Sequence, residues 1–257
     1  MNRFHRSRHC ALLASVAALM LTLNACGDPR VNLSMISPEE KFRLAMIDFE
    51  NDDFKEAQEK FTAIIIQDPT SPWADDAQFY LGEAHFRNDE YLLAAFQYNR
   101  LRSNFPNSPF YRQALFRTAE AYEKSSPNLE RDQTDTRTAI AQYEAFVRLY
   151  PGDSLAPSAR EHITVLRTKL ANKEFSIAEQ YWRMDEYHSA LIYYDRVIEL
   201  YPDTPYHERS IIGRIRALQQ LERDQEARDA IDRYIQENPN SSTSPQLRQL
   251  KSDLGRP

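Results

Sequence analysis

The sequence predicts an all-α fold, a right-handed α-solenoid of about five helix hairpins with a short C-terminal capping helix. The first observation is a 37-residue period, in which Pro69 and Pro106, and again Pro202 and Pro239, mark equivalent points. The second is the composition, with 5 glycines and 27% charged residues among 257. A fixed period of roughly 20–50 residues indicates stacked copies of one supersecondary unit, each burying its apolar face against its neighbours. Such stacks present extended surfaces, so the sequence favours binding over catalysis.

Residues 1–25 are predicted to be a cleaved secretory signal. They begin with three arginines and no carboxylate, and they continue into an apolar run from Ala11 to Leu23. That run is shorter than the roughly 20 residues that a membrane-spanning helix needs. A basic start, a short apolar centre and small residues before a cleavage site are typical of secretory signals.

Cys26 stands where the cleavage site is expected, directly after Asn24 and Ala25. This arrangement resembles a bacterial lipobox. The resemblance implies that Cys26 becomes the mature N-terminus and carries covalent lipid, with residues 26–37 as a linker. Gly27, in place of an aspartate, favours by the same resemblance the periplasmic face of the outer membrane. The alternative is an ordinary cleaved signal with an incidental cysteine.

The charge balance argues against some partners. The net charge at pH 7 is −6, and it becomes −9 once the three arginines of residues 1–25 are removed. An acidic chain without runs of Lys or Arg is a poor ligand for nucleic acid, so we expect no nucleic-acid partner and a membrane link through the lipid alone. Because Cys10 leaves with the signal, we expect no disulfide, zinc cluster or thiol nucleophile.

The solenoid is predicted over residues 38–257, in units of about 38–70, 71–107, 108–152, 153–203 and 204–240 with a cap at 244–254. Each unit should hold helix A, a turn, helix B and an exit marked by proline. A small residue on helix A, followed by alanine and aromatic residues at fixed spacing on helix B, is typical of the tetratricopeptide repeat. The pattern residues are Ala45, Phe54, Ala57 and Phe61; Gly82, Tyr91, Ala94 and Tyr98; Ala119, Ala139 and Tyr143; Ala178, Tyr187, Ala190 and Tyr194; and Ala227 and Ile231.

Two units are longer than 37 residues. In unit three the excess falls in the polar stretch from Lys124 to Thr136, which is predicted to be a loop between the two helices. In unit four it falls in an unbroken helical pattern from about Ser158 to Trp182, which is predicted to be one lengthened helix A.

A hydroxyl residue directly before a proline marks the start of most units. A Ser or Thr at the N-cap accepts a hydrogen bond from an otherwise unpaired N–H, and proline is tolerated at the first helical position. We therefore expect helices to begin at these pairs. They are Ser37-Pro38, Ser71-Pro72, Ser108-Pro109, Thr204-Pro205 and Ser244-Pro245.

An apolar stripe recurs along the predicted A helices. Its members are Phe42, Phe79, Phe116, Phe175 and Ile212, with Phe49, Phe86 and Trp182 seven residues further along. The stripe could line a groove for an apolar peptide, but apolar residues at a helical period are more often core, and we favour packing. Unit one has no preceding repeat to cover it. Candidate groove residues are therefore Phe42, Met46 and Phe49, followed by Phe79 and Phe86.

No catalytic or metal-binding pattern is evident, so we expect neither an enzyme nor a cofactor other than the lipid. The glycines are isolated, which excludes phosphate-binding loops and nucleophile elbows. The carboxylate pairs Asp52-Asp53 and Asp75-Asp76 are placed in the first turns of helices, where acidic residues complement the helix dipole. The stretch from Asp185 to His188 is interpreted as a turn leading into helix B.

A lipobox followed at once by five such repeats is similar to the BamD family of lipoproteins, which belongs to the outer-membrane β-barrel assembly machinery. The likeness lies in the linkers Asp68 to Pro72, Phe105 to Pro109 and Tyr201 to Pro205. It covers nearly all of the chain after the signal. Many periplasmic proteins contain such repeats, but the combination of anchor, repeat number and length is more specific.

The resemblance implies a scaffold with protein partners. The C-terminal repeats would dock a POTRA domain of a BamA-like barrel subunit, and the N-terminal repeats would engage unfolded outer-membrane proteins or other assembly lipoproteins. One alternative is another periplasmic tetratricopeptide lipoprotein that coordinates envelope or peptidoglycan synthesis, which would usually show fewer repeats behind a longer linker. A second is a helical envelope enzyme such as a lytic transglycosylase, which would need a non-repeating catalytic domain.

Overall fold

The computed structural model describes residues 32–254. The predicted signal, Cys26 and Gly27 lie outside the described residues. The chain divides into Met1–Ser37 and Pro38–Pro257. In the first unit the described residues form one short 3₁₀ turn, Leu33–Met35, whose start is capped by the side chain of Asn32.

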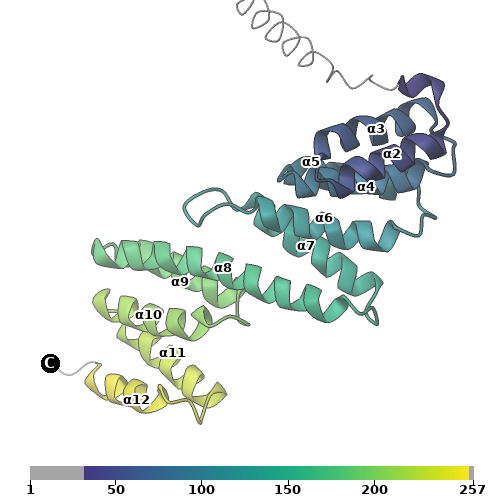
Figure 1. The fold of residues 1–257 in the computed structure, drawn as a ribbon. Coiled ribbons are helices and arrows are strands. Elements are labelled where there is room, and N and C mark those ends of the chain that lie inside the picture. Colours follow the sequence, from purple (N-terminus) through teal and green to yellow (C-terminus); the bar gives the residue numbers. More distant parts are fainter. Residues whose placement is uncertain (1–31, 255–257) are drawn as a thin grey trace, which may run out of the picture. The chain divides into compact units, whose positions relative to one another are not determined.

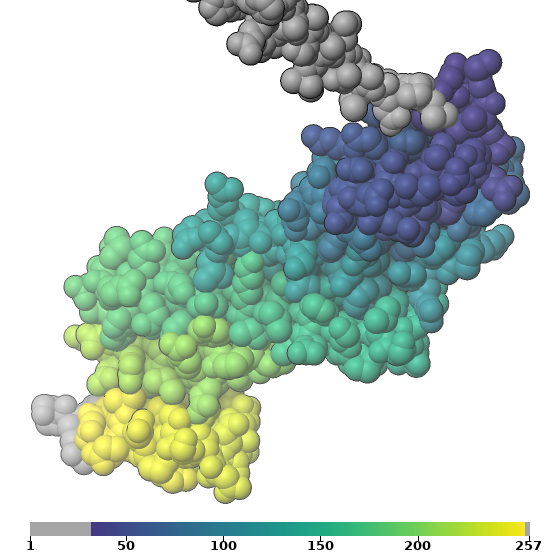
Figure 2. All heavy atoms as spheres, viewed as in Figure 1, coloured from purple at the N-terminus to yellow at the C-terminus, as the bar shows by residue number. Residues whose placement is uncertain are grey.

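The described part of the second unit is built from eleven α-helices and contains no strand, which confirms the all-α prediction (Figure 1). Each helix packs mainly against the helices before and after it in the chain, as expected for a solenoid. In the space-filling view the side chains join the successive hairpins into one continuous stack (Figure 2). The hairpins are α2 (Pro38–Glu50) with α3 (Phe54–Gln67), α4 (Ala74–Arg87) with α5 (Tyr91–Asn104), α6 (Tyr111–Ser125) with α7 (Thr134–Leu149), α8 (Ala156–Arg183) with α9 (Tyr187–Leu200), and α10 (Tyr206–Gln220) with α11 (Asp224–Glu237), followed by α12 (Ser244–Asp253).

The two length anomalies of the sequence appear as predicted. Helix α8 is 28 residues long, twice the length of α4 or α9. Between α6 and α7 the chain forms a loop, which is held by the buried side chain of Gln133. Its Nε2 donates to the carbonyl oxygens of Asn128 and Arg131 at 2.8 and 3.1 Å.

Four hairpins share one left-handed residue at the turn. Its φ is 63° at Asp52, 59° at Asp89 and Asp185, and 57° at Glu222. In each turn the following N–H donates to a carbonyl five residues earlier at 2.9–3.0 Å, a closure typical of helix C-termini. Asp52 therefore lies in the turn after α2, two residues before α3 begins, and not in the first turn of α3, which corrects that assignment. The interpretation of Asp185 as part of a turn is confirmed.

The predicted role of the linker hydroxyls is wrong for α10 and α12, because the hydroxyls of Thr204 and Ser244 donate to backbone carbonyl oxygens and do not cap the helices. It is also wrong for α4 and α6. These helices begin at Ala74 and Tyr111, after the Ser-Pro pairs. The hydroxyls of Ser71 and Ser108 instead accept the N–H two residues further on, each at 3.2 Å. A serine hydroxyl can stabilise a tight turn in this way as well as a helix start. Helix α2 does begin at its proline, Pro38.

The small residues of helix A allow close packing, as the sequence predicts. Ala45, Ala119 and Ala178 are fully buried. At Gly82 an added Cβ would lie 2.5 Å from a ring carbon of Tyr98, which is itself fully buried on α5. The ring of Tyr98 therefore occupies the space that any larger residue at position 82 would need.

We expect Gly82→Ala to lower the free energy of unfolding by up to about 2 kcal/mol. Overpacking a core costs about 1–3 kcal/mol, and the better helix propensity of alanine offsets about 1 kcal/mol. Urea denaturation followed by circular dichroism measures the change. The matched control is Gly152→Ala, where an added Cβ meets nothing within 4 Å. It should be neutral or stabilising, and equal effects at the two glycines would contradict the packing argument.

Candidate partner-binding surfaces

The middle of the apolar stripe is part of the core. Phe79, Phe116 and Phe175 expose 3, 5 and 7% of their surface. Phe79 stacks on Phe110 with ring centroids 4.5 Å apart. For these members the packing interpretation holds, because little of each ring remains for a ligand.

The candidate groove residues divide between two clusters. Phe42, Met46 and Phe49 pack in the core between the first two hairpins, whereas Phe79 and Phe86 belong to the next core cluster. Phe49 is 4% exposed. Phe42, Met46 and Phe86 keep partly exposed edges. Their binding of a peptide stays a prediction.

Arginine side chains cover two of these phenylalanines. The Arg87 guanidinium carbon lies 4.3 Å from the centre of the Phe49 ring, and that of Arg117 lies 4.0 Å from the centre of Phe86. A guanidinium over an aromatic face is attracted by the ring quadrupole. A ligand that reached these rings would therefore have to displace the arginines.

Hydrogen bonds and an ion pair at the Glu83 carboxylate connect α4, α5 and α6. Arg117 donates from Nε and Nη2 to the two Glu83 oxygens at 2.6 and 2.7 Å, and the Tyr98 hydroxyl donates to Oε1 at 2.5 Å. Nη1 of Arg117 also reaches Glu120 at 2.9 Å. Burial, and next to it the Glu83 carboxylate, raises the pKa of the Tyr98 phenol, so the phenol stays protonated and can donate.

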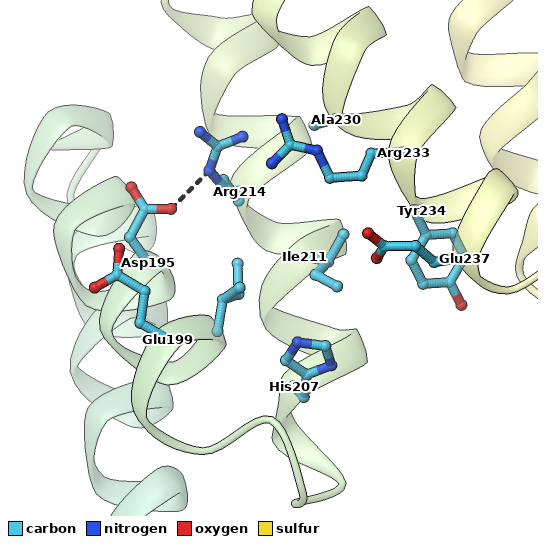
Figure 3. Close-up of a pocket in the computed structure, with 10 residues that line it drawn as sticks. Asp195, Glu199, His207, Ile211, Arg214, Ala230, Arg233, Tyr234 and Glu237 are labelled. Atoms are coloured by element: carbon cyan, nitrogen blue, oxygen red, sulfur yellow. Dashed lines mark hydrogen bonds and ion pairs between the residues drawn. The ribbon is translucent and has the colours of Figure 1, made fainter.

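A hollow of ≈ 320 Å³ lies between α9, α10 and α11 (Figure 3). Its apolar lining includes Ile198 and Ile211. Asp195 and Arg214 pair across it at 2.6 Å. Arg233 also lines it and has no ion-pair partner within residues 32–254. The sequence analysis missed this pocket because its charged residues are not part of the repeat pattern.

Two further hollows lie along α10, the first beside α8 and the second mainly beside α12. The first, of ≈ 300 Å³, is lined by Phe175, Arg183 and Arg209 among others. The second, of ≈ 380 Å³, includes Trp182 and Ile212. Phe175, Trp182 and Ile212 are the stripe residues that line these hollows. The sequence pointed to unit one, where peptide binding stays a prediction.

Within residues 32–254 no group of His, Cys, Asp or Glu side chains is placed to hold a metal ion. In the same range we find no helix with the length and apolarity needed to cross a bilayer.

The chain is 26% identical over 92 residues to the outer membrane protein assembly factor BamD of Vibrio cholerae, a match that spans 36% of this chain and 38% of that protein. Among solved structures, a tetratricopeptide repeat protein from Parabacteroides merdae matches 84% of this chain and 72% of its own length at 16% identity, with a TM-score of 0.38. The TPR2AB domain of yeast Sti1, solved as a complex with pHSP90, matches 85% of this chain and 98% of its own length at 13% identity, with a TM-score of 0.40.

One family covers most of the described residues. The YfiO family, described as an outer membrane lipoprotein, matches residues 35–234. This range includes all five hairpins except the last three residues of α11. The chain belongs to the YfiO family of outer membrane lipoproteins.

Proposed function

We propose that this chain is a lipid-anchored scaffold of the outer-membrane β-barrel assembly machinery, which acts by binding and not by catalysis. The observation that carries the proposal is the family match over residues 35–234, together with a relative that is named an outer membrane protein assembly factor. The stacked hairpins fit this role, because repeat stacks expose long surfaces on which several proteins can bind side by side.

The proposed partners are a BamA-like subunit that carries POTRA domains, unfolded outer-membrane proteins and other assembly lipoproteins. Hollows of ≈ 300–380 Å³ lie along the last two hairpins. Each combines apolar side chains with charged ones. Such a lining suits a protein segment that itself contains both apolar and charged side chains. Membrane attachment is proposed to come from lipid on Cys26. Eleven residues separate Cys26 from Pro38, and the chain between these two residues spans at most about 40 Å.

The proposal is tested by purification from native membranes. Membranes are solubilised in a mild detergent, the chain is captured through a C-terminal tag, and the proteins that accompany it are identified by mass spectrometry. We expect a large barrel protein with POTRA domains in stoichiometric amount. The control is an unrelated outer-membrane lipoprotein with the same tag.

Two other results of this purification would count against the assembly role. Recovery of cell-wall synthases in place of the barrel protein would favour the alternative of a lipoprotein that coordinates peptidoglycan synthesis. Recovery of the chain alone, under conditions that keep other membrane complexes intact, would contradict a stable complex.

A further inference from the structure

At two equivalent positions of helix A, the side-chain charge changes from negative in the earlier repeats to positive in the last one. The residue directly after the small position is Met46, Glu83, Glu120 and Glu179 in units one to four, but Arg216 in unit five. The residue seven positions earlier is acidic in units one and two, as Glu39 and Asp76, and becomes Arg209 in unit five. Packing does not require this reversal, because both arginines are exposed.

These two arginines and Arg183 line the two hollows along α10. None of the three has an ion-pair partner among residues 32–254, although the chain as a whole is acidic. Arg117 in the middle of the stack is different, because Glu83 and Glu120 neutralise it. Arg183, Arg209 and Arg216 are therefore positive charges without an ion pair among residues 32–254.

Apolar side chains lie between the charges. Trp182 and Ile212 line the second hollow together with Leu250 of α12. Arg209, Ile212 and Arg216 are three and four residues apart on α10, so they lie along one face of that helix and place the two hollows one after the other beside it. We call this surface the seam groove and define it by Trp182, Arg183, Arg209, Ile212, Arg216 and Leu250.

We propose that the seam groove binds an extended segment of a protein partner in which carboxylates alternate with apolar side chains. Guanidinium groups form strong paired hydrogen bonds with carboxylates, and Trp182 and Ile212 supply an apolar surface between the charges. The proposal rests on the proposed scaffold function and specifies the chemistry of one partner segment.

Two features of the groove limit where the partner's carboxylates bind. Glu179 lines the first hollow and accepts the Tyr194 hydroxyl at 2.6 Å, so it repels a carboxylate nearby. Arg209 lies over Phe175, with 4.4 Å from its guanidinium carbon to the ring centre, which holds its charge at the groove. The partner's carboxylates should therefore contact Arg209 and Arg216, and its apolar side chains should contact Trp182.

The test uses the full chain in detergent and a fluorescein-labelled ten-residue peptide that alternates Glu with Leu and Phe. Fluorescence anisotropy should show binding that weakens as salt rises, because exposed charges are screened. A peptide with Lys in place of Glu should bind at least ten-fold more weakly. Arg216→Glu should weaken binding of the acidic peptide at least ten-fold, Arg216→Gln less, and Arg216→Lys least.

The matched control is Arg100→Glu. It makes the same charge change at another exposed arginine without an ion pair, on α5 and away from the groove. Its binding should stay within two-fold of the unchanged chain. Equal losses at Arg100 and Arg216, or equal binding of the acidic and basic peptides, would overturn the proposal.

Binding to vesicles of phosphatidylglycerol that depends on Arg216, without binding of the peptide, would show a lipid site instead and would also overturn the proposal. The scaffold function is judged separately by the purification above. That purification can succeed while the peptide fails to bind, and the reverse is also possible.

Discussion

Replacing Cys26 with alanine is expected to move the chain from the membrane fraction to the soluble fraction. Each buried methylene of an acyl chain contributes about 0.8 kcal/mol to membrane binding, and two or more chains give a stable anchor. Within residues 32–254 no helix could replace that anchor by crossing the bilayer. Loss of the lipid should therefore remove the direct link to the membrane.

The matched control for this change is Cys10→Ala. Cys10 lies in the predicted signal, so its replacement should leave the mature chain anchored. Membranes are washed with alkaline carbonate, which releases proteins held only by other proteins, and palmitate labelling follows the lipid. Retention of the Cys26→Ala chain after the wash, or palmitate on it, would show that the lipid assignment is wrong.

Tyr98→Ala should lower the free energy of unfolding by about 3–5 kcal/mol, the range for removing a buried aromatic ring. The ring is fully buried on α5, 5.8 Å from the Phe79 ring centre and against Gly82. Its hydroxyl also donates to Glu83. Removal leaves a cavity between α4 and α5 that rigid neighbours cannot fill. Urea denaturation measures the loss.

Two variants separate the contributions to this effect. Tyr98→Phe keeps the ring and removes one hydrogen bond, so we expect a loss of about 1 kcal/mol. Phe96→Ala removes an aromatic ring from the same helix, but that ring is 55% exposed, and exposed substitutions usually change stability by about 0.5 kcal/mol or less. A loss at position 98 no larger than at position 96 would contradict the packing argument.

The sequence predicted the helices and their order because the repeat is a local pattern. Small residues such as Gly82, aromatic residues such as Tyr98 and the closing prolines recur at a fixed distance along the chain. The spacing of the closing prolines along the chain also located the long loop and the lengthened α8. The hydroxyl caps were placed wrongly, because Ser71 and Ser108 can stabilise a turn before the helix as well as the helix start.

Side chains that meet across the stack were not predictable. Lys41 is 2% exposed and reaches Gln67 and Asp68 at 2.8 and 2.6 Å, yet a lysine in an amphipathic pattern usually indicates a solvent-exposed position. Met46 and Phe61 in unit one are replaced by Glu83 and Tyr98 in unit two. The sequence shows that both positions changed, and the structure shows that the second pair shares a hydrogen bond.

The sequence by itself determined that this chain is a stack of helix hairpins, since the repeat and the helical period are both spacings along the chain. Only the tertiary structure decided where the stack is open. Phe86 and Trp182 hold the same place in the repeat, but the Arg117 guanidinium lies 4.0 Å from the centre of the Phe86 ring, whereas Trp182 lines a hollow of ≈ 380 Å³. Exposure depends on the residues that a neighbouring hairpin brings close in space, and these are far away along the chain.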